Sequence, residues 1–259
     1  YAEQYIYQTP ATVSDSDGDG VSDHQEIKKG RNPEGRGRVF ADVNEGDFYT
    51  DEVGYLYKRG SVKGYNVNGE QRFEPERTVN RAEFVTMVVN AFDIKKPTFF
   101  GDSEPSGVTV SPVFSDVAAD TWYFEPIDRA YNNGLISGEV QNNSVIFRPG
   151  DAITRSEAVA ILLKASKVLE QTSYDNSRTS SACITPFNDI STQDWFCDSV
   201  RSAQQVGVAT GKEEGYFHPF DPLTRGEAAV MLQRTLEKDA LFVPSESESP
   251  SFFNLHSFN

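Results

Sequence analysis

The stretch DAITRSEAVAILLKAS, residues Asp151 to Ser166, carries the start signal of an amphipathic helix. Thr154 is followed three residues later by Glu157, which is the spacing of a capping box, in which two side chains bond backbone N–H groups at a helix start. Apolar residues then recur on one helical face at Ala158, Ile161, Leu162 and Ala165. Arg155 lies in the first turn, where the helix dipole disfavours a positive charge. The pattern predicts a helix and leaves this arginine to be explained.

The same helix start occurs twice more, in TVNRAEFVTMVVNAF from Thr78 and in PLTRGEAAVMLQRTL from Pro222. Upstream of each copy lies a Phe-x-Asp, with an aromatic residue eight positions after the phenylalanine and glycines twelve and sixteen positions after that aromatic residue. A Phe-x-Pro follows, and its phenylalanine precedes the helix cap by seven residues. The phenylalanines of the two motifs are Phe40 and Phe73, Phe114 and Phe147, and Phe187 and Phe217. The chain therefore contains three copies of one unit.

Each unit is typical of a short helix led by the aromatic residue, a glycine cap, a turn and a capped second helix. The glycines at the cap position are Gly60, Gly134 and Gly207. A two-helix unit of this size cannot bury both apolar faces alone, so the copies should pack on one another. We expect a mainly α fold in which three tandem two-helix units pack around a pseudo-threefold axis.

The composition narrows the classes of function. The 259 residues carry a net charge of −15, which argues against general binding to nucleic acid or to anionic membrane surfaces. Apolar runs are shorter than the roughly 18 residues of a membrane-spanning helix, and the first residues do not form a signal peptide. If the protein is secreted, we expect this sequence to be a mature form or a fragment. Cys183 and Cys197 form one disulfide or remain as two thiols.

Signs of catalysis are few. The three histidines, His24, His218 and His256, do not stand at a useful spacing from a nucleophile. No phosphate-binding loop, zinc spacing or cofactor motif is recognisable. We therefore expect no enzymatic activity in this segment. A glycan-active enzyme is the weakest alternative, and an enzyme domain upstream of Tyr1 would not be visible here.

The combination of Phe-x-Asp-Val, Trp-Tyr, Gly-Leu-Ile-x-Gly, Phe-x-Pro and Thr-Arg-x-Glu resembles the S-layer homology domain. Three tandem copies, from about Phe40 to Leu236, are similar to the cell-wall anchoring regions of bacterial surface proteins. The resemblance implies an extracellular, three-pronged helical module. It also implies binding to a secondary cell-wall polysaccharide, often carrying pyruvyl ketals, or to a related peptidoglycan-linked glycan.

This implied ligand suggests a role for the arginines. A helix N-terminus with an adjacent guanidinium makes a carboxylate site, and a pyruvyl ketal presents a carboxylate on a sugar. We expect each arginine to head a groove between neighbouring units, so that Arg155→Ala weakens wall binding and leaves thermal stability nearly unchanged. The predicted ligand-binding residues are Arg81, Arg155 and Arg225, the stacking residues Trp122 and Trp195, the glycines Gly64, Gly138 and Gly211, and the aspartates Asp42, Asp116 and Asp189.

A structural interpretation of the same residues stays open. Each arginine could instead pair with the Phe-x-Asp aspartate of a neighbouring copy, and each tryptophan could belong to the core. The copies are also unequal. The first has Asn80 for threonine and Phe48 for tryptophan, with Phe48 or Tyr49 as its weaker stacking surface, and the third has Gly226 in the arginine turn. We expect at most two strong sites.

A second motif, DSDGDGVSDHQE, precedes the repeats. The oxygen ligands of a calcium loop would be Asp15, Asp17, Asp19, the Val21 carbonyl, Asp23 and Glu26, at positions 1, 3, 5, 7, 9 and 12. Gly20 stands at the sixth position, where the turn requires glycine. No entering helix is evident, so the loop resembles a thrombospondin type 3 repeat rather than a complete EF-hand. The alternative is a solvated acidic linker.

Together these features predict a non-catalytic cell-surface anchoring module that binds an anionic, pyruvylated cell-wall polysaccharide and carries a calcium-rigidified linker. The alternative is a structural subunit of an S-layer or surface filament, in which the units mediate protein assembly. The predicted organisation is a linker (1–14), a calcium loop (15–34), three repeats (38–96, 112–170 and 185–238) with linkers between them (97–111 and 171–184), and a tail (239–259).

Overall fold

The computed structural model describes residues 22–31, 39–96, 112–166 and 183–240. Within these ranges the chain is mainly helical, as the repeat pattern predicts. The elements are α2 (Asp23–Lys28), α3 (Thr50–Lys58), β1 (Tyr65–Val67), β2 (Glu70–Arg72), α4 (Arg81–Ala91), α5 (Phe124–Asn132), β3 (Glu139–Gln141), β4 (Ser144–Ile146), α6 (Arg155–Ala165), α8 (Cys197–Gln205) and α9 (Arg225–Ala240). Among the described helices, none combines the length and the apolar composition needed to cross a membrane. The predicted linker 1–14, the first four calcium-ligand positions and most of the predicted tail lie outside the described residues.

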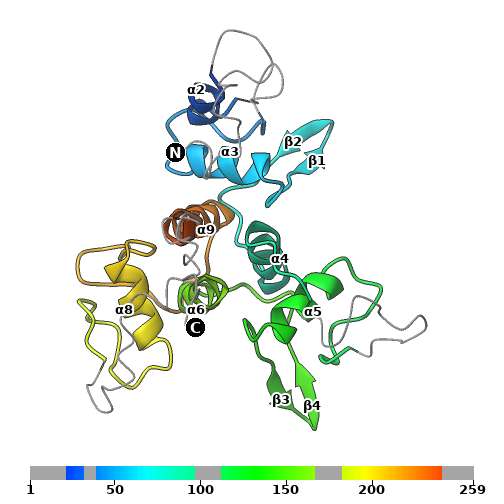
Figure 1. The fold of residues 1–259 in the computed structure, drawn as a ribbon, viewed down its shortest axis with the longest axis vertical. Coiled ribbons are helices and arrows are strands. Elements are labelled where there is room, and N and C mark those ends of the chain that lie inside the picture. The colour runs from blue at the N-terminus through cyan, green and yellow to red at the C-terminus, as the bar shows by residue number, and fades with distance from the viewer. Residues whose placement is uncertain (1–21, 32–38, 97–111, 167–182, 241–259) are drawn as a thin grey trace, which may run out of the picture.

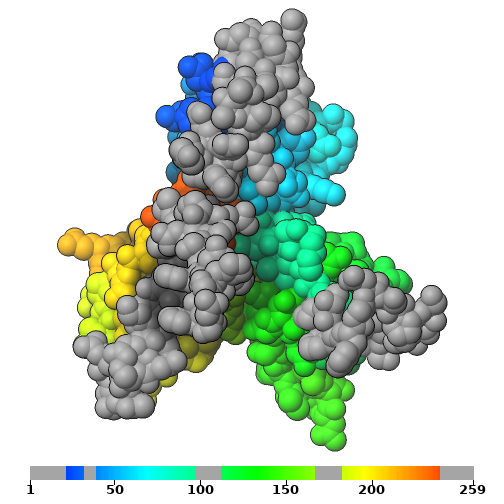
Figure 2. Space-filling model, viewed as in Figure 1, coloured from blue at the N-terminus to red at the C-terminus, as the bar shows by residue number. Residues whose placement is uncertain are grey.

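The second helices of the three repeats, α4, α6 and α9, meet at the centre of the molecule (Figure 1). The first helices, α3, α5 and α8, lie outside them on three arms. Each first helix packs against the second helix of the preceding repeat, with α5 on α4 and α8 on α6, and α3 packs on α9. The repeats therefore form a closed ring, and the space-filling view shows three lobes around a common centre (Figure 2).

The central helices carry apolar residues on nearly all sides, as expected for helices that are surrounded by other helices. In α6, Leu162 and Leu163 are fully buried, and Val159 and Ala158 are equally inaccessible. Each arm adds its own small core around the two repeated phenylalanines. The ring centroids of these pairs lie 5.5 Å apart in the first repeat and 5.4 Å apart in the second and third.

The predicted helix ends are confirmed. Asn80 with Glu83 and Thr154 with Glu157 form complete capping boxes at the starts of α4 and α6. In the third repeat, Thr224 and Glu227 exchange the same two hydrogen bonds. The three glycines that follow the first helices have φ of 70°, 70° and 77°, the left-handed conformation that glycine adopts without strain.

The loops before the Phe-x-Pro motifs contain hairpins that the sequence interpretation did not include. β1 pairs with β2 and β3 with β4, both antiparallel, and each hairpin projects from its arm (Figure 1). Asn68 and Gly69 turn the first hairpin with positive φ, as do Asn142 and Asn143 in the second. The Asn-Gly pair is a recognised hairpin signal. The third repeat, whose loop is shorter, keeps only the bridge between Glu213 and Tyr216.

Cys183 and Cys197 form a disulfide, with their Cα atoms 6.2 Å apart. This settles the alternative that the sequence left open. The bond ties the segment before the third repeat to the first residue of α8. Since Cys197 stands two residues after Trp195, the bond also restrains the segment that carries this aromatic side chain.

Helix α2 begins inside the predicted calcium loop and packs against α3 of the first repeat. Ile27 is buried there, and a Cβ atom at Gly54 would lie 3.1 Å from the Ile27 side chain, so the two helices approach closely. Lys58 of α3 donates a hydrogen bond of 2.6 Å to the Asp23 carboxylate. Asp23 and Glu26, the last two predicted calcium ligands, are therefore buried beside the first repeat rather than in a separate linker.

Candidate functional site

Each of the three repeated arginines reaches into the next repeat of the ring. Arg81 donates from Nε to the carbonyl of Phe147 at 3.0 Å, and its guanidinium lies 4.7 Å from the centre of that ring. Arg155 makes the same contacts with Phe217, and Arg225 with Phe73. The third repeat thus contacts the first, and the arginines close the ring.

The backbone N–H groups at these helix starts are also bonded to the next repeat. Arg81 donates from its backbone to Asp151 at 2.9 Å, and Ala82 donates to Pro149 at 3.1 Å. The corresponding bonds of the other repeats are Arg155 to Asp221, Ser156 to Pro219, Arg225 to Arg77 and Gly226 to Pro75. A negatively charged ligand beside these helices would therefore meet the arginine side chains rather than free N–H groups of the helix starts.

Burial gives the arginines a structural role. Arg155 and Arg225 are only 5% and 4% exposed, and burial lowers the pKa of both guanidinium groups from the ordinary value. The closest carboxylates are glutamates of the next repeat, with Arg81 2.6 Å from Glu157 and Arg155 3.8 Å from Glu227. From this geometry we expect, in contrast to the prediction from the sequence, that Arg155→Ala lowers thermal stability.

The Phe-x-Asp aspartates act within their own repeats. Asp42 accepts hydrogen bonds of 2.8 Å from the backbone N–H groups of Phe73 and Glu74. Asp116 and Asp189 hold the equivalent residues in the same way. These bonds connect the two repeated motifs of each unit. Arg81 and Arg155 form their ion pairs with glutamates instead of these aspartates.

The three glycines of the predicted site allow close packing inside the arm. A Cβ atom at Gly64 would lie 2.7 Å from the carbonyl oxygen of Arg72 and 2.8 Å from a ring carbon of Phe40. Gly138 and Gly211 face the same kind of crowding. Gly138 also lines the groove described below. A ligand in that groove could therefore come close to the backbone at this glycine.

The aromatic residues that begin the first helices are exposed rather than buried. Trp122, Trp195 and Phe48 are 62%, 67% and 63% exposed. The residues that follow Phe48 and Trp195 turn inward, with Tyr49 and Phe196 only 6% and 1% exposed, and Tyr123 is partly buried. The core interpretation of the tryptophans is therefore wrong, and their rings are available for contact with a ligand.

A groove of about 270 Å³ lies beside the loop of the second repeat, and all three repeats line it. Arg81 comes from the first repeat, Lys164 and Gly138 from the second, and Trp195 from the third. Its charged lining consists of Arg81, Arg148, Lys164, Glu139 and Glu157. Cations exceed carboxylates here, although the chain as a whole is strongly acidic.

Lys164 was missed from the sequence. It stands seven residues after the capping glutamate of α6, where the first and third repeats have Asn90 and Arg234. A comparison of repeats emphasises what the copies share, whereas this position differs in each copy. The charge of the groove is therefore set by a residue that the repeat pattern does not identify.

The chain is thus built as a closed ring of three helical repeats, with a cationic and aromatic groove between them. The model of the S-layer homology domain matches residues 39–85, 113–159 and 186–229. The chain belongs to the S-layer homology domain family. Domains of this family bind cell-wall polymers and place their proteins at the bacterial cell surface.

Relatives with different names share this segment. An amylopullulanase of Thermoanaerobacterium thermosulfurigenes is 32% identical over 78% of the chain, and the exoglucanase XynX of Acetivibrio thermocellus is 33% identical over 77%. The surface-layer 125 kDa protein of Lysinibacillus sphaericus is 30% identical over 76%. The matched region is only 10%, 16% and 15% of these proteins, respectively. The similarity thus concerns a module found in both enzymes and surface-layer proteins.

Proposed function

We propose that this chain is a non-catalytic anchoring module that binds an anionic cell-wall polysaccharide, pyruvylated on some of its sugars. The observation that carries the proposal is the groove in which Arg81, Lys164 and Trp195 converge from three repeats. In this proposal the packing of the three repeats serves to create this groove, because its lining requires side chains from neighbouring units.

The chemistry of the groove fits a carboxylate carried on a sugar. Guanidinium and ammonium groups donate charge-assisted hydrogen bonds to carboxylates, which are about twice as strong as bonds between neutral groups. The indole of Trp195 offers a large exposed apolar face with a polar edge, suited to the face of a sugar ring. Gly138 has no side chain to block approach along the loop.

Sedimentation with cell-wall sacculi tests the proposal. The protein is expected to co-sediment with untreated sacculi and to stay in the supernatant after mild acid has removed ketal-linked pyruvate. Trp195→Ala serves as a second probe, because an exposed residue can be changed with little effect on folding, and it is expected to reduce binding. Equal binding before and after acid treatment would show that another group of the glycan is recognised.

The alternative function is assembly into an S-layer or surface filament. The similarity to a surface-layer protein favours it. The two functions give different results in the sedimentation experiment. An assembly subunit would form sedimenting material without sacculi, whereas an anchoring module would require them.

We further propose that calcium binds the acidic loop before the first repeat. The predicted ligands Asp15, Asp17, Asp19 and the Val21 carbonyl lie outside the described residues, and Asp23 and Glu26 lie together in the first turn of α2. These two carboxylates fit a hard cation, which prefers oxygen ligands. Bound calcium would stabilise α2, and through Ile27 and Gly54 it would stabilise the first repeat as well.

A comparison of melting temperatures tests the calcium proposal. Calcium at a few times its dissociation constant is expected to raise the melting temperature relative to the same protein in a chelator, because a ligand bound only to the folded state stabilises it. Asp19→Ala is expected to abolish the rise, and Asp51→Ala, an acidic residue of α3, serves as the control. Identical unfolding of the unmodified protein with and without calcium would contradict the site.

A further inference from the structure

Helix α3 of the first repeat carries two residues that the other repeats do not share. Gly54 and Lys58 stand four positions apart, so they lie on the same face of the helix. This face of α3 packs against α2, the helix that precedes the first repeat (Figure 1). The two residues therefore suit the contact with α2 rather than a requirement of the repeat. The equivalent positions hold Asp128 and Asn132 in the second repeat, and Arg201 and Gln205 in the third.

Lys58 forms a buried ion pair with α2. Its Nζ atom lies 2.6 Å from Oδ2 of Asp23, and the two side chains are only 14% and 5% exposed. Taking a carboxylate out of water is costly unless a cation accompanies it, so the ammonium group supplies a positive charge that buried Asp23 requires. Together with the packing of Ile27 against Gly54, this pair holds α2 on the first repeat.

Asp23 has a second role in the proposed calcium loop, where it is the ligand at position 9 and Glu26 is the ligand at position 12. Both carboxylates stand in the first turn of α2 and are buried. A calcium ion in the loop would have to share the Asp23 carboxylate with the ammonium group of Lys58. Two cations at one carboxylate repel each other, and the repulsion is strong where water is largely excluded. Lys58 therefore opposes the binding of calcium at this ligand.

We propose that Lys58 is an internal competitor of calcium: it takes the place of the ion at Asp23, weakens calcium binding and keeps α2 packed on the first repeat when calcium is scarce. The inference rests on the proposed calcium site. Calcium sites of extracellular modules have dissociation constants of about 10⁻⁴ to 10⁻³ M, and a lysine bonded to one of the ligands brings a loop toward this range. The ion then adds stability only where it is abundant.

Calorimetric titration of the protein with calcium tests this competition. Lys58→Gln removes the charge but keeps a side chain that can donate a hydrogen bond to Asp23, and glutamine is the residue at this position of the third repeat. The variant is expected to bind calcium about tenfold or more tightly than the unmodified protein, because one repulsive charge in a poorly solvated site is removed. Damage to α2 cannot produce this result, since a damaged site would bind calcium more weakly.

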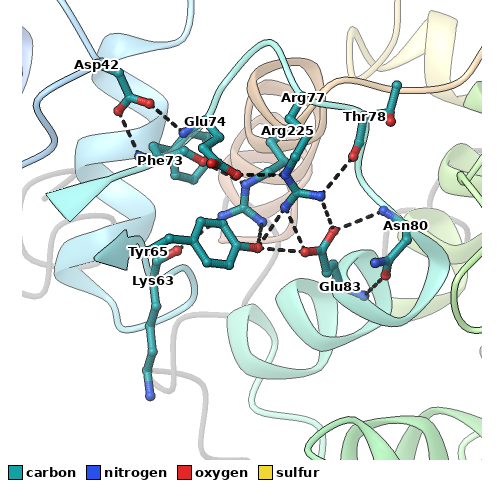
Figure 3. Close-up of polar contacts among 10 residues, drawn as sticks. All are labelled: Asp42, Lys63, Tyr65, Phe73, Glu74, Arg77, Thr78, Asn80, Glu83 and Arg225. Carbon is teal, nitrogen blue, oxygen red and sulfur yellow. Dashed lines mark hydrogen bonds and ion pairs between the residues drawn. The ribbon is translucent and has the colours of Figure 1, made fainter. Parts of the chain in front are cut away.

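Two further variants serve as controls. Lys58→Arg keeps the positive charge and is expected to bind calcium as weakly as the unmodified protein. Lys63→Gln makes the same change of charge at an exposed lysine of the same repeat, whose side chain points away from the polar cluster around Glu83 (Figure 3). Its calcium affinity should stay within about twofold of the unmodified protein, because salt screens an exposed charge.

The melting temperature in a chelator tests the second part of the proposal. Without calcium, Lys58→Gln is expected to melt at a lower temperature than Lys63→Gln, because Asp23 loses its buried ion pair. Addition of calcium should then raise the melting temperature of Lys58→Gln more than that of Lys63→Gln, because the tighter ligand stabilises the folded state more.

Other outcomes would contradict the proposal at different steps. If Lys58→Gln bound calcium no more tightly than the unmodified protein, or if Lys58→Arg or Lys63→Gln bound it equally tightly, the competition would be overturned and the calcium site would stand. Equal melting temperatures of Lys58→Gln and Lys63→Gln in the chelator would overturn the role of the ion pair in holding α2. If neither the unmodified protein nor Lys58→Gln bound calcium, the proposed site itself would be overturned, and the inference with it.

Discussion

Replacing Arg155 by alanine is expected to lower the free energy of unfolding by about 3–5 kcal/mol, the cost typical of removing one partner of a buried charged network. The side chain donates to the carbonyls of Phe217 and Thr210 and covers the Phe217 ring. Alanine would leave both carbonyls without this donor and would open a cavity between two repeats. Denaturant unfolding followed by circular dichroism measures the effect.

Arg201→Ala is the matched control, because it removes an arginine from α8 that is partly exposed and pairs with Asp198 one turn away. Such surface pairs contribute less than about 1 kcal/mol. Suppose that Arg155→Ala unfolded at the same denaturant concentration as this control but lost wall binding. The role of the arginine would then be in ligand binding alone, as the repeat pattern first suggests.

Gly138→Ala is expected to destabilise the protein by about 3 kcal/mol, at the upper end of the usual cost of overpacking. A Cβ atom at this position would lie 2.6 Å from a ring carbon of Phe114 and 2.8 Å from the carbonyl oxygen of Ile146. Backbone and a buried ring cannot move aside as a flexible side chain can. The melting temperature should fall accordingly, and hydrogen exchange should accelerate in the hairpin of β3 and β4.

Gly150→Ala provides the comparison within the same repeat, since a Cβ atom there would meet nothing within 4 Å. The melting temperature of this variant should stay unchanged or rise slightly, because alanine reduces the freedom of the unfolded chain. Equal stability of the two alanine variants would mean that the arm relaxes around Gly138 and that close packing does not explain this glycine.

The predictions that the structure confirms depend on local chemistry. The boxes at Asn80 and Thr154 and the cap at Gly134 involve residues a few positions apart, so sequence spacing contains the whole interaction. The hairpins were missed although Asn68 and Gly69 provide a local turn signal, because only the first repeat carries that pair.

Contacts between repeats could not be predicted from local spacing, because they join residues that are far apart in the sequence. Arg81 bonds to Phe147 and Glu157, which stand 66 and 76 residues away in the sequence. Helical periodicity says that an arginine begins the helix, but not which neighbour faces it. The exposed state of Trp195 and the position of Lys164 depend on the same packing between repeats. The set of residues that line the groove can therefore be identified only from the packed structure of the three repeats.

The closure of that ring sets the number of repeats. In a linear array, units can be added or removed at either end, and stability grows with length. Here α3 of the first repeat covers α9 of the third, so the array has no ends to extend. A chain with one repeat fewer would leave two apolar helix faces open to water, and a fourth repeat would have no face to join. The three repeats therefore form one indivisible structural unit, and removing any one of them should destabilise the other two.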